Sequence, residues 1–232
     1  MLSAASKVSN YIKESFKEAC EIRVPKGTDM TSSRILLSAA FVVAITHTAQ
    51  AQPPTPDAEA LINAKVLREI SDWINTDIVR VTIAAQNKRY DKLDASSIAA
   101  LDNQWTQERE SDDKPLIAAT LSNPLSVYLS RMQGRSLGLY AEIFVMDQNG
   151  LNVGQSSITS DFWQGDEDKF LKTFNVSADA VFIDEAEFDS DFGIWRAQVS
   201  MTVQDAQATT PIGAVTVELN LTELERRSVS GT

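Results

Sequence analysis

The spacing of apolar residues changes near Leu139 and divides the chain into a helical region, 57–138, and a sheet region, 139–224. Between residues 57 and 88, apolar side chains recur every three or four positions, which predicts one long helix. Its stripe consists of Leu67, Ile70, Ile74, Ile78, Val81 and Ala85, with Val66 and Trp73 on a second, partial face. Two apolar faces predict either that one face meets a partner or that both pack inside the domain.

Two more helices are predicted before the change of spacing. "SSIAALDNQWTQERES" predicts a helix that begins at Asp94 or Ser96 and ends in a charged, solvated stretch. "NPLSVYLSRMQGRSLG" predicts another, because Asn123 suits the position before a helix, Pro124 suits its first turn, and a glycine can end it.

From Leu139 onward apolar and polar residues alternate, which predicts β-strands. "LYAEIFVMDQNGLNVGQSS" predicts a hairpin with a tight turn at Asn149-Gly150. A short acidic helix follows, and "AVFIDEAEF", "WRAQVSMTV" and "GAVTVELNL" predict three further strands. This order predicts an α+β domain with one five-stranded antiparallel sheet.

The stretch "MTSSRILLSAAFVVAITHTAQAQ", residues 30–52, has the pattern of a secretory signal peptide. Basic Arg34 precedes an apolar run, and "AQA" is a small-x-small site that predicts cleavage after Ala51. The run is about half the ~20 residues that a membrane-spanning helix needs, which disfavours a permanent anchor. We expect translation to start at Met30, the alternative being a genuine extension over residues 1–29. The domain 52–232 is therefore expected in the periplasm or outside the cell.

Cleavage after Ala51 would also remove Cys20 and His47, the only cysteine and histidine. Without them one chain cannot build a thiolate nucleophile, a Ser-His-Asp triad or a His/Cys zinc site. The formal net charge is −11; six of the 21 Lys and Arg and four of the 32 Asp and Glu lie before Gln52, so the remainder carries −13. Such a charge disfavours nucleic acid and anionic lipid as partners.

The order of elements resembles the single-module form of the extracellular PAS-like sensor family called Cache or PDC, over residues 57–224. The resemblance rests on the leading helix, "YAEIFVMDQNGLNV", "SDFWQGDEDKF" and "IGAVTVELNLTEL". It implies a pocket for a carboxylate, an amino acid or another metabolite between the sheet and residues 159–174, without a cofactor. Because no signalling module follows residue 224, it also implies a partner such as a membrane-bound sensor kinase or receptor.

We predict a ligand site formed by one group of residues around this pocket. They are Tyr128, Arg131, Tyr140, Asp161, Trp163, Gly165, Asp184 and Arg196. Arg131 and Arg196 each offer a guanidinium for a ligand carboxylate, or are ordinary surface charges. Trp163 either closes over the ligand as a lid or closes the core over the sheet.

Two other kinds of chemistry are considered for the acidic residues of the sheet region. Asp161, Asp166, Glu167 and Asp168 include a candidate catalytic pair, but stabilisation of a helix N-terminus explains the last three. Residues 184–193 offer oxygen ligands for Ca²⁺, yet Phe192 stands where the EF-hand loop needs glycine. We therefore predict no metal site and no catalytic residue.

The sequence favours an exported, soluble, metabolite-binding sensor module that acts through a partner protein, and not an enzyme. The first alternative is a ligand-free PAS-like interaction module that forms a homodimer through the helix over residues 57–88. A hydrolase that uses only carboxylates is the third and least favoured class.

Overall fold

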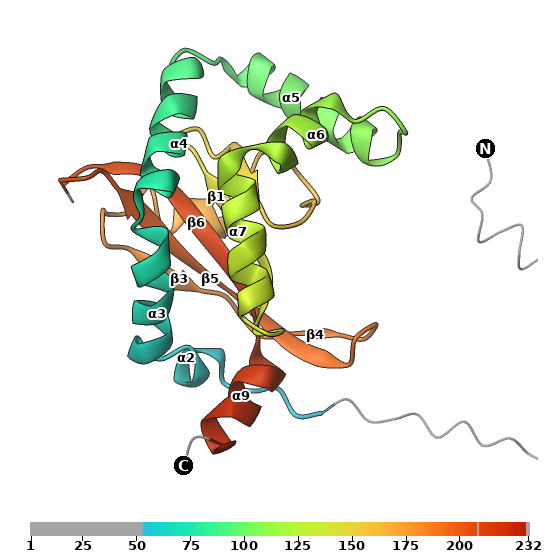
Figure 1. The fold of residues 1–232 in the computed structure, drawn as a ribbon, viewed down its shortest axis with the longest axis vertical. Coiled ribbons are helices and arrows are strands. Elements are labelled where there is room, and N and C mark those ends of the chain that lie inside the picture. The colour runs from blue at the N-terminus through green and yellow to red at the C-terminus, as the bar shows by residue number, and fades with distance from the viewer. Residues whose placement is uncertain (1–52, 208, 231–232) are drawn as a thin grey trace, which may run out of the picture. The chain divides into compact units, whose positions relative to one another are not determined.

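The structure is a computed structural model that describes residues 53–207 and 209–230 (Figure 1). The chain separates into two units, residues 1–50 and 51–232, and the described residues all belong to the second. The predicted signal peptide and the segment before it lie outside the described residues.

Helices precede the sheet, as the sequence predicts, but the single long helix predicted over residues 57–88 is wrong. Three helices occupy this stretch: α2 (Ala58–Leu61), α3 (Ala64–Ile74) and α4 (Asp77–Arg89). At the first break the side chain of Asn63 accepts hydrogen bonds from two backbone amides of α3. At the second break the hydroxyl of Thr76 donates to the carbonyl of Trp73. Asn and Thr side chains compete in this way with helical hydrogen bonds, which apolar periodicity does not register.

The next helices are α5 (Ala95–Arg109), α6 (Pro115–Ser122) and α7 (Pro124–Arg135). The predicted starts of α5 and α7 are confirmed, since the side chains of Asp94 and Asn123 accept amide hydrogen bonds there. Helix α6 was not predicted from the sequence. A residue of another helix stabilises the first turn of α6: the buried carboxylate of Glu108 in α5 accepts a hydrogen bond from the backbone amide of Ile117 at 2.9 Å.

The predicted α+β class with an antiparallel sheet is confirmed. The strands are β1 (Tyr140–Met146), β2 (Asn152–Gln155), β3 (Val181–Ile183), β4 (Glu187–Asp189), β5 (Ile194–Gln204) and β6 (Pro211–Asn220). Their order is β2-β1-β6-β5-β3, and β4 also pairs with β5. The sheet has six strands where five were predicted, because the segment "AVFIDEAEF" forms both β3 and β4, which pair with different parts of β5.

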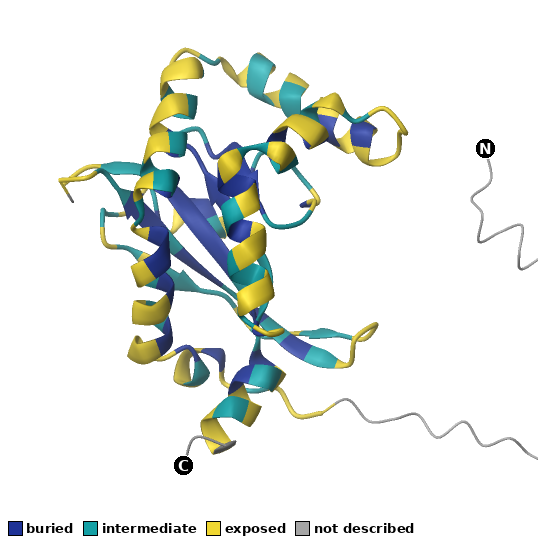
Figure 2. Ribbon diagram, in the orientation of Figure 1, coloured by how far each residue is buried: buried dark blue, intermediate teal, exposed yellow. Residues whose placement is uncertain are grey.

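One face of the sheet carries the main core. Helices α3, α4 and α7 lie across this face in Figure 1, and Figure 2 shows their buried residues turned toward the strands. Ile70 and Ile74, which were candidates for a dimer interface, are buried in this core together with Val66 and Trp73. In α3 both predicted apolar faces thus pack internally, whereas Val81 and Ala85, the end of the predicted stripe in α4, are exposed.

Two short helices complete the fold around the strands. Helix α8 (Asp168–Leu171) lies between β2 and β3, and helix α9 (Leu221–Ser230) follows β6 directly. None of the helices in residues 53–207 and 209–230 is long and apolar enough to cross a membrane.

Candidate functional site

The sheet face opposite the main core carries polar side chains in register. Residues on alternate positions of a strand share a face, and directly paired residues of neighbouring strands lie side by side. Glu142 of β1 pairs with Glu218 of β6, which in turn pairs with Gln198 of β5. Two carboxylates and an amide therefore form one row across the sheet.

The segment between β2 and β3 covers part of this face. Phe170 of α8 stacks on Phe174 with ring centres 5.0 Å apart, and both pack with Phe144 and Met146 of β1. The Lys169 Nζ lies 5.5 Å from the centre of the Phe144 ring. Apolar contacts thus fix α8 over the centre of the face and leave the polar row beside it.

A cavity of about 270 Å³ lies beside α8 on this face. It is lined by residues of the covering segment, of the β3–β4 region and of β5 and β6: Glu167, Asp168, Lys169, Asp184, Glu185, Glu187, Arg196, Ala197, Gln198 and Glu218. The lining brings together segments that are far apart in sequence, and their charged groups converge on one small volume. Such convergence is typical of a binding site for a small polar molecule.

The two basic side chains of the lining already have carboxylate partners. Arg196 forms ion pairs with Asp189 and, at 3.2 Å, with Glu218. The Lys169 Nζ is 2.7 Å from a carboxylate oxygen of Glu167. The Arg196 Nε is buried and has no hydrogen-bond partner among the described residues.

Glu142 lies next to this cavity, and its surroundings shift the pKa of its carboxyl group. The Ser157 hydroxyl donates a 2.6 Å hydrogen bond to it, and Glu218 lies directly opposite. Burial raises the pKa of the Glu142 carboxyl above its ordinary value, and the negative charge of Glu218 raises the pKa further. The Ser157 hydrogen bond and the positive charges of Lys169 and Arg196 oppose this rise without cancelling it. The charged form of Glu142 is therefore disfavoured in the folded protein.

Glu142→Gln is expected to raise the Tm at pH 7 by about 2–4 °C, which corresponds to about 1 kcal/mol in a domain of this size. The amide keeps an oxygen for Ser157 and removes the charge. Because the folded-state pKa of Glu142 is raised, the wild-type protein gains stability as the pH falls through that pKa toward the ordinary value of 4.5. The advantage of the variant should shrink over the same range, as measured by thermal melts from pH 8 to pH 4. A constant advantage across this range would contradict the assignment.

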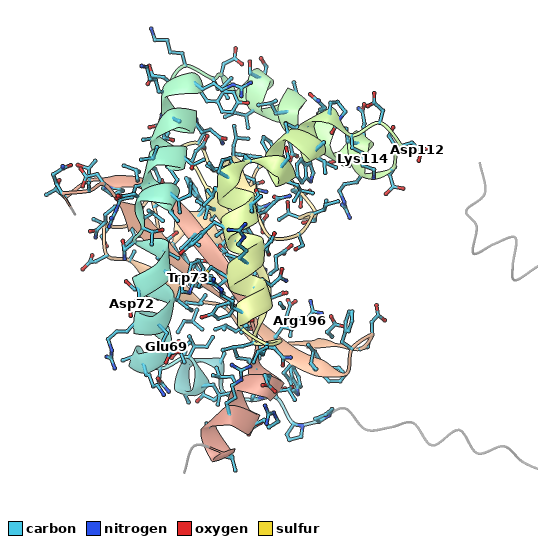
Figure 3. All side chains as sticks on the ribbon, viewed as in Figure 1. Glu69, Asp72, Trp73, Asp112, Lys114 and Arg196 are labelled. Carbon is cyan, nitrogen blue, oxygen red and sulfur yellow. The ribbon has the colours of Figure 1, made fainter. Side chains whose placement is uncertain are left out.

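The eight predicted site residues fall in separate places. Asp184 and Arg196 line the cavity. Tyr128 and Tyr140 pack against the core on the helix-covered face, where the Tyr128 hydroxyl donates to the carbonyl of Trp73 at 2.8 Å. Figure 3 places Trp73 between α3 and α7. Arg131 is exposed on α7.

The other three predicted residues gather at the turn of the β1–β2 hairpin. The Trp163 Nε1 donates to the carbonyl of Asn149 at 2.8 Å, and Gly165 lies against Gly150. The Asp161 carbonyl accepts hydrogen bonds from the side chains of Asn152, Thr159 and Gln164. These contacts fasten the covering segment to the hairpin and support the core-closing interpretation of Trp163.

Several residues that line the cavity, and Glu142 beside them, were not predicted from the sequence as site residues. Glu142, Gln198 and Glu218 occupy the polar positions of alternating strands, so the alternation marked their face. It did not show that they meet, because that depends on the order of the strands in the sheet. Lys169 carried no signal apart from its place in the short acidic helix. No group of three or more His, Cys, Asp or Glu within the described part of the chain is placed to hold a metal ion.

Neither a protein-family model nor a curated protein matches the sequence. Among solved structures, the chain matches the ligand-binding domain of the Pseudomonas aeruginosa amino acid chemoreceptor PctC in complex with GABA, with 15% identity and a TM-score of 0.31 over 69% of this chain and 62% of that one. It matches the sensory domain of the Campylobacter jejuni chemoreceptor Tlp3 with 15% identity and a TM-score of 0.35 over 70% and 65%.

The sensor domain of the Vibrio cholerae histidine kinase DctB matches with 18% identity and a TM-score of 0.32 over 70% of this chain and 58% of that one. This chain thus spans less than two thirds of the length of these three solved chains. All three of these solved chains are described as sensory or ligand-binding domains.

Proposed function

We propose that this chain is a small-molecule-binding sensor module and that its ligand occupies the cavity beside α8. The observation that carries the proposal is the convergence of charged groups from α8, β5 and β6 on one cavity of about 270 Å³. That volume is just below the usual range of about 300–1,000 Å³ for small-molecule sites, which restricts the ligand to a metabolite of about amino-acid size. Two of the residues predicted from the sequence, Asp184 and Arg196, belong to this lining.

A second hollow of about 540 Å³ lies between α2, α3 and α9. Apolar side chains such as Leu61, Val66 and Leu224 form much of its wall, with Lys65, Glu69 and Arg227 among its polar groups. It is the larger of the two, but the polar sheet face and the covering segment that the resemblance connects with a ligand do not contribute to it. The charged cavity is therefore the better candidate.

The position of α8 gives a route from binding to signalling. Glu167, Asp168 and Lys169 belong to the covering segment, whereas Arg196, Gln198 and Glu218 belong to the sheet. A ligand that contacts both sets would favour one placement of α8 over others, and a ligand shifts an equilibrium only through such differential contacts. We propose that an exported form of the chain presents this change to a membrane-bound receptor or sensor kinase.

A metabolite screen by thermal shift on the full chain tests the proposal. At a concentration 100 times its Kd, a ligand stabilises the folded state by about 2.7 kcal/mol, which should raise the Tm by roughly 5–10 °C. Gln198→Ala should reduce that shift, while Gln107→Ala, an exposed glutamine of α5, should leave it unchanged. If no metabolite in a broad panel shifts the Tm, the chain is better explained as a ligand-free interaction module.

A further inference from the structure

The charges at the cavity differ from those of a carboxylate-binding site. Its two basic groups, Arg196 and Lys169, are held by Glu218, Asp189 and Glu167. A ligand carboxylate would have to compete with these partners for each cation. Breaking such a pair leaves a carboxylate uncompensated, which is costly where water is partly excluded.

Several carboxylates of the lining have no basic partner in the described part of the chain. Asp184 and Glu185 form none of the ion pairs found there, although Asp184 accepts a hydrogen bond from the amide of Glu185. Glu187 lies directly opposite Arg196 in the β4–β5 ladder but forms no ion pair with it. Asp168 is the remaining acidic residue of the lining and pairs with Lys172 at 2.8 Å. After every ion pair is counted, the wall of the cavity keeps an excess of negative charge.

The paired glutamates of the sheet are an independent observation that points the same way. Glu142 lies opposite Glu218, and its one side-chain hydrogen-bond partner in the described structure is the neutral hydroxyl of Ser157. Arg196 is shared between Asp189 and Glu218 and forms no ion pair with Glu142. Like charges in neighbouring positions destabilise a sheet, and a cation brought by a ligand would remove that cost.

We infer that the ligand of this cavity carries a cationic amine, and that the site selects it over an anion of the same size. This inference rests on the proposed function and narrows it, because the sequence resemblance implied carboxylates and amino acids alike. The negative net charge of the chain would also speed the approach of a cation.

Three four-carbon probes that differ only in their end groups test the inference: 1,4-diaminobutane, 4-aminobutanoate and butanedioate. Titration calorimetry on the full chain, at about 0.15 M salt to screen surface attraction, should give the diamine at least a tenfold lower Kd than the dianion. A Kd for butanedioate equal to or below that of the diamine would overturn the inference.

A matched pair of variants separates the cavity from general attraction to an acidic protein. Asp184→Asn keeps the oxygen that accepts from Glu185 and should raise the Kd of the diamine at least fivefold. Asp112→Asn removes the same charge in the α5–α6 loop, which Figure 3 shows well away from Arg196, and should change the Kd by less than twofold. Equal effects of the two variants would mean adventitious attraction and would overturn the inference.

The metabolite screen distinguishes failure of the inference from failure of the proposed function. Absence of binding by all three probes at 10 mM, together with a Tm shift caused by an anionic or neutral metabolite that depends on Gln198, would overturn the cation preference and leave the proposed function standing. Absence of any shift in the screen would overturn both.

Discussion

Gly150→Ala is expected to lower the free energy of unfolding by more than about 3 kcal/mol, because two costs add at this position. Gly150 has a φ of +77°, in the left-handed region that side chains disfavour by about 1–2 kcal/mol. In addition, a Cβ on Gly150 would lie 2.4 Å from the Cα of Gly165, and backbone cannot yield as a flexible side chain can. The Gly150 carbonyl also accepts the Gln164 amide at 2.8 Å, so a shift of the turn would loosen the covering segment.

Gly193→Ala provides the control for this experiment. Gly193 has a similar φ of +66°, but a Cβ there would meet no atom within 4 Å. Its substitution should therefore cost about 1 kcal/mol from backbone strain alone. Denaturant melts of both variants measure the difference, which is the contribution of the close approach between Gly150 and Gly165. Equal losses in the two variants would show that this approach is not important for stability.

Trp163→Ala is expected to lower the free energy of unfolding by about 3 kcal/mol, the lower end of the usual range for a large aromatic residue because this side chain is partly exposed. The ring packs with the cluster of Trp105, Phe162 and Leu151, and its N–H satisfies the Asn149 carbonyl. Trp163→Phe keeps an aromatic ring and loses the N–H donor, so a smaller loss of about 1 kcal/mol is expected.

The same variants decide between the two roles that the sequence leaves open for Trp163. If it closes the core, Trp163→Ala should leave the affinity of the folded protein for a ligand found in the screen unchanged. If it is a lid, affinity should fall roughly ten- to a hundredfold while stability is kept. Calorimetry at a temperature where both proteins are folded, beside the denaturant melt, measures the two quantities separately.

The candidate site was only partly visible in the sequence. Asp184 and Arg196 were predicted and line the cavity, whereas Tyr128 and Tyr140 belong to the opposite, helix-covered face. A tyrosine or an arginine on a helix or strand near a pocket can lie inside the pocket or away from it. Which of them reach it depends on the face and the strand order, and neither follows from residue type.

The sequence by itself determined the elements whose signals are local. The change from helical to alternating spacing near Leu139, the caps at Asp94 and Asn123, and the Asn149-Gly150 turn all agree with the structure. Each of these signals arises from hydrogen bonds or backbone angles within a few residues, so a short stretch of chain is sufficient to specify it.

Only the tertiary structure decided which residues from distant parts of the chain lie side by side. The first turn of α6 depends on a carboxylate from α5, and the pairing of Glu142 with Glu218 depends on β6 lying between β1 and β5. Arg196 is neutralised by Asp189 and Glu218 because β4 and β6 both pair with β5, which brings these two carboxylates within reach of its side chain. Contacts between residues far apart in the chain are selected by packing of the whole domain, so no local pattern records them.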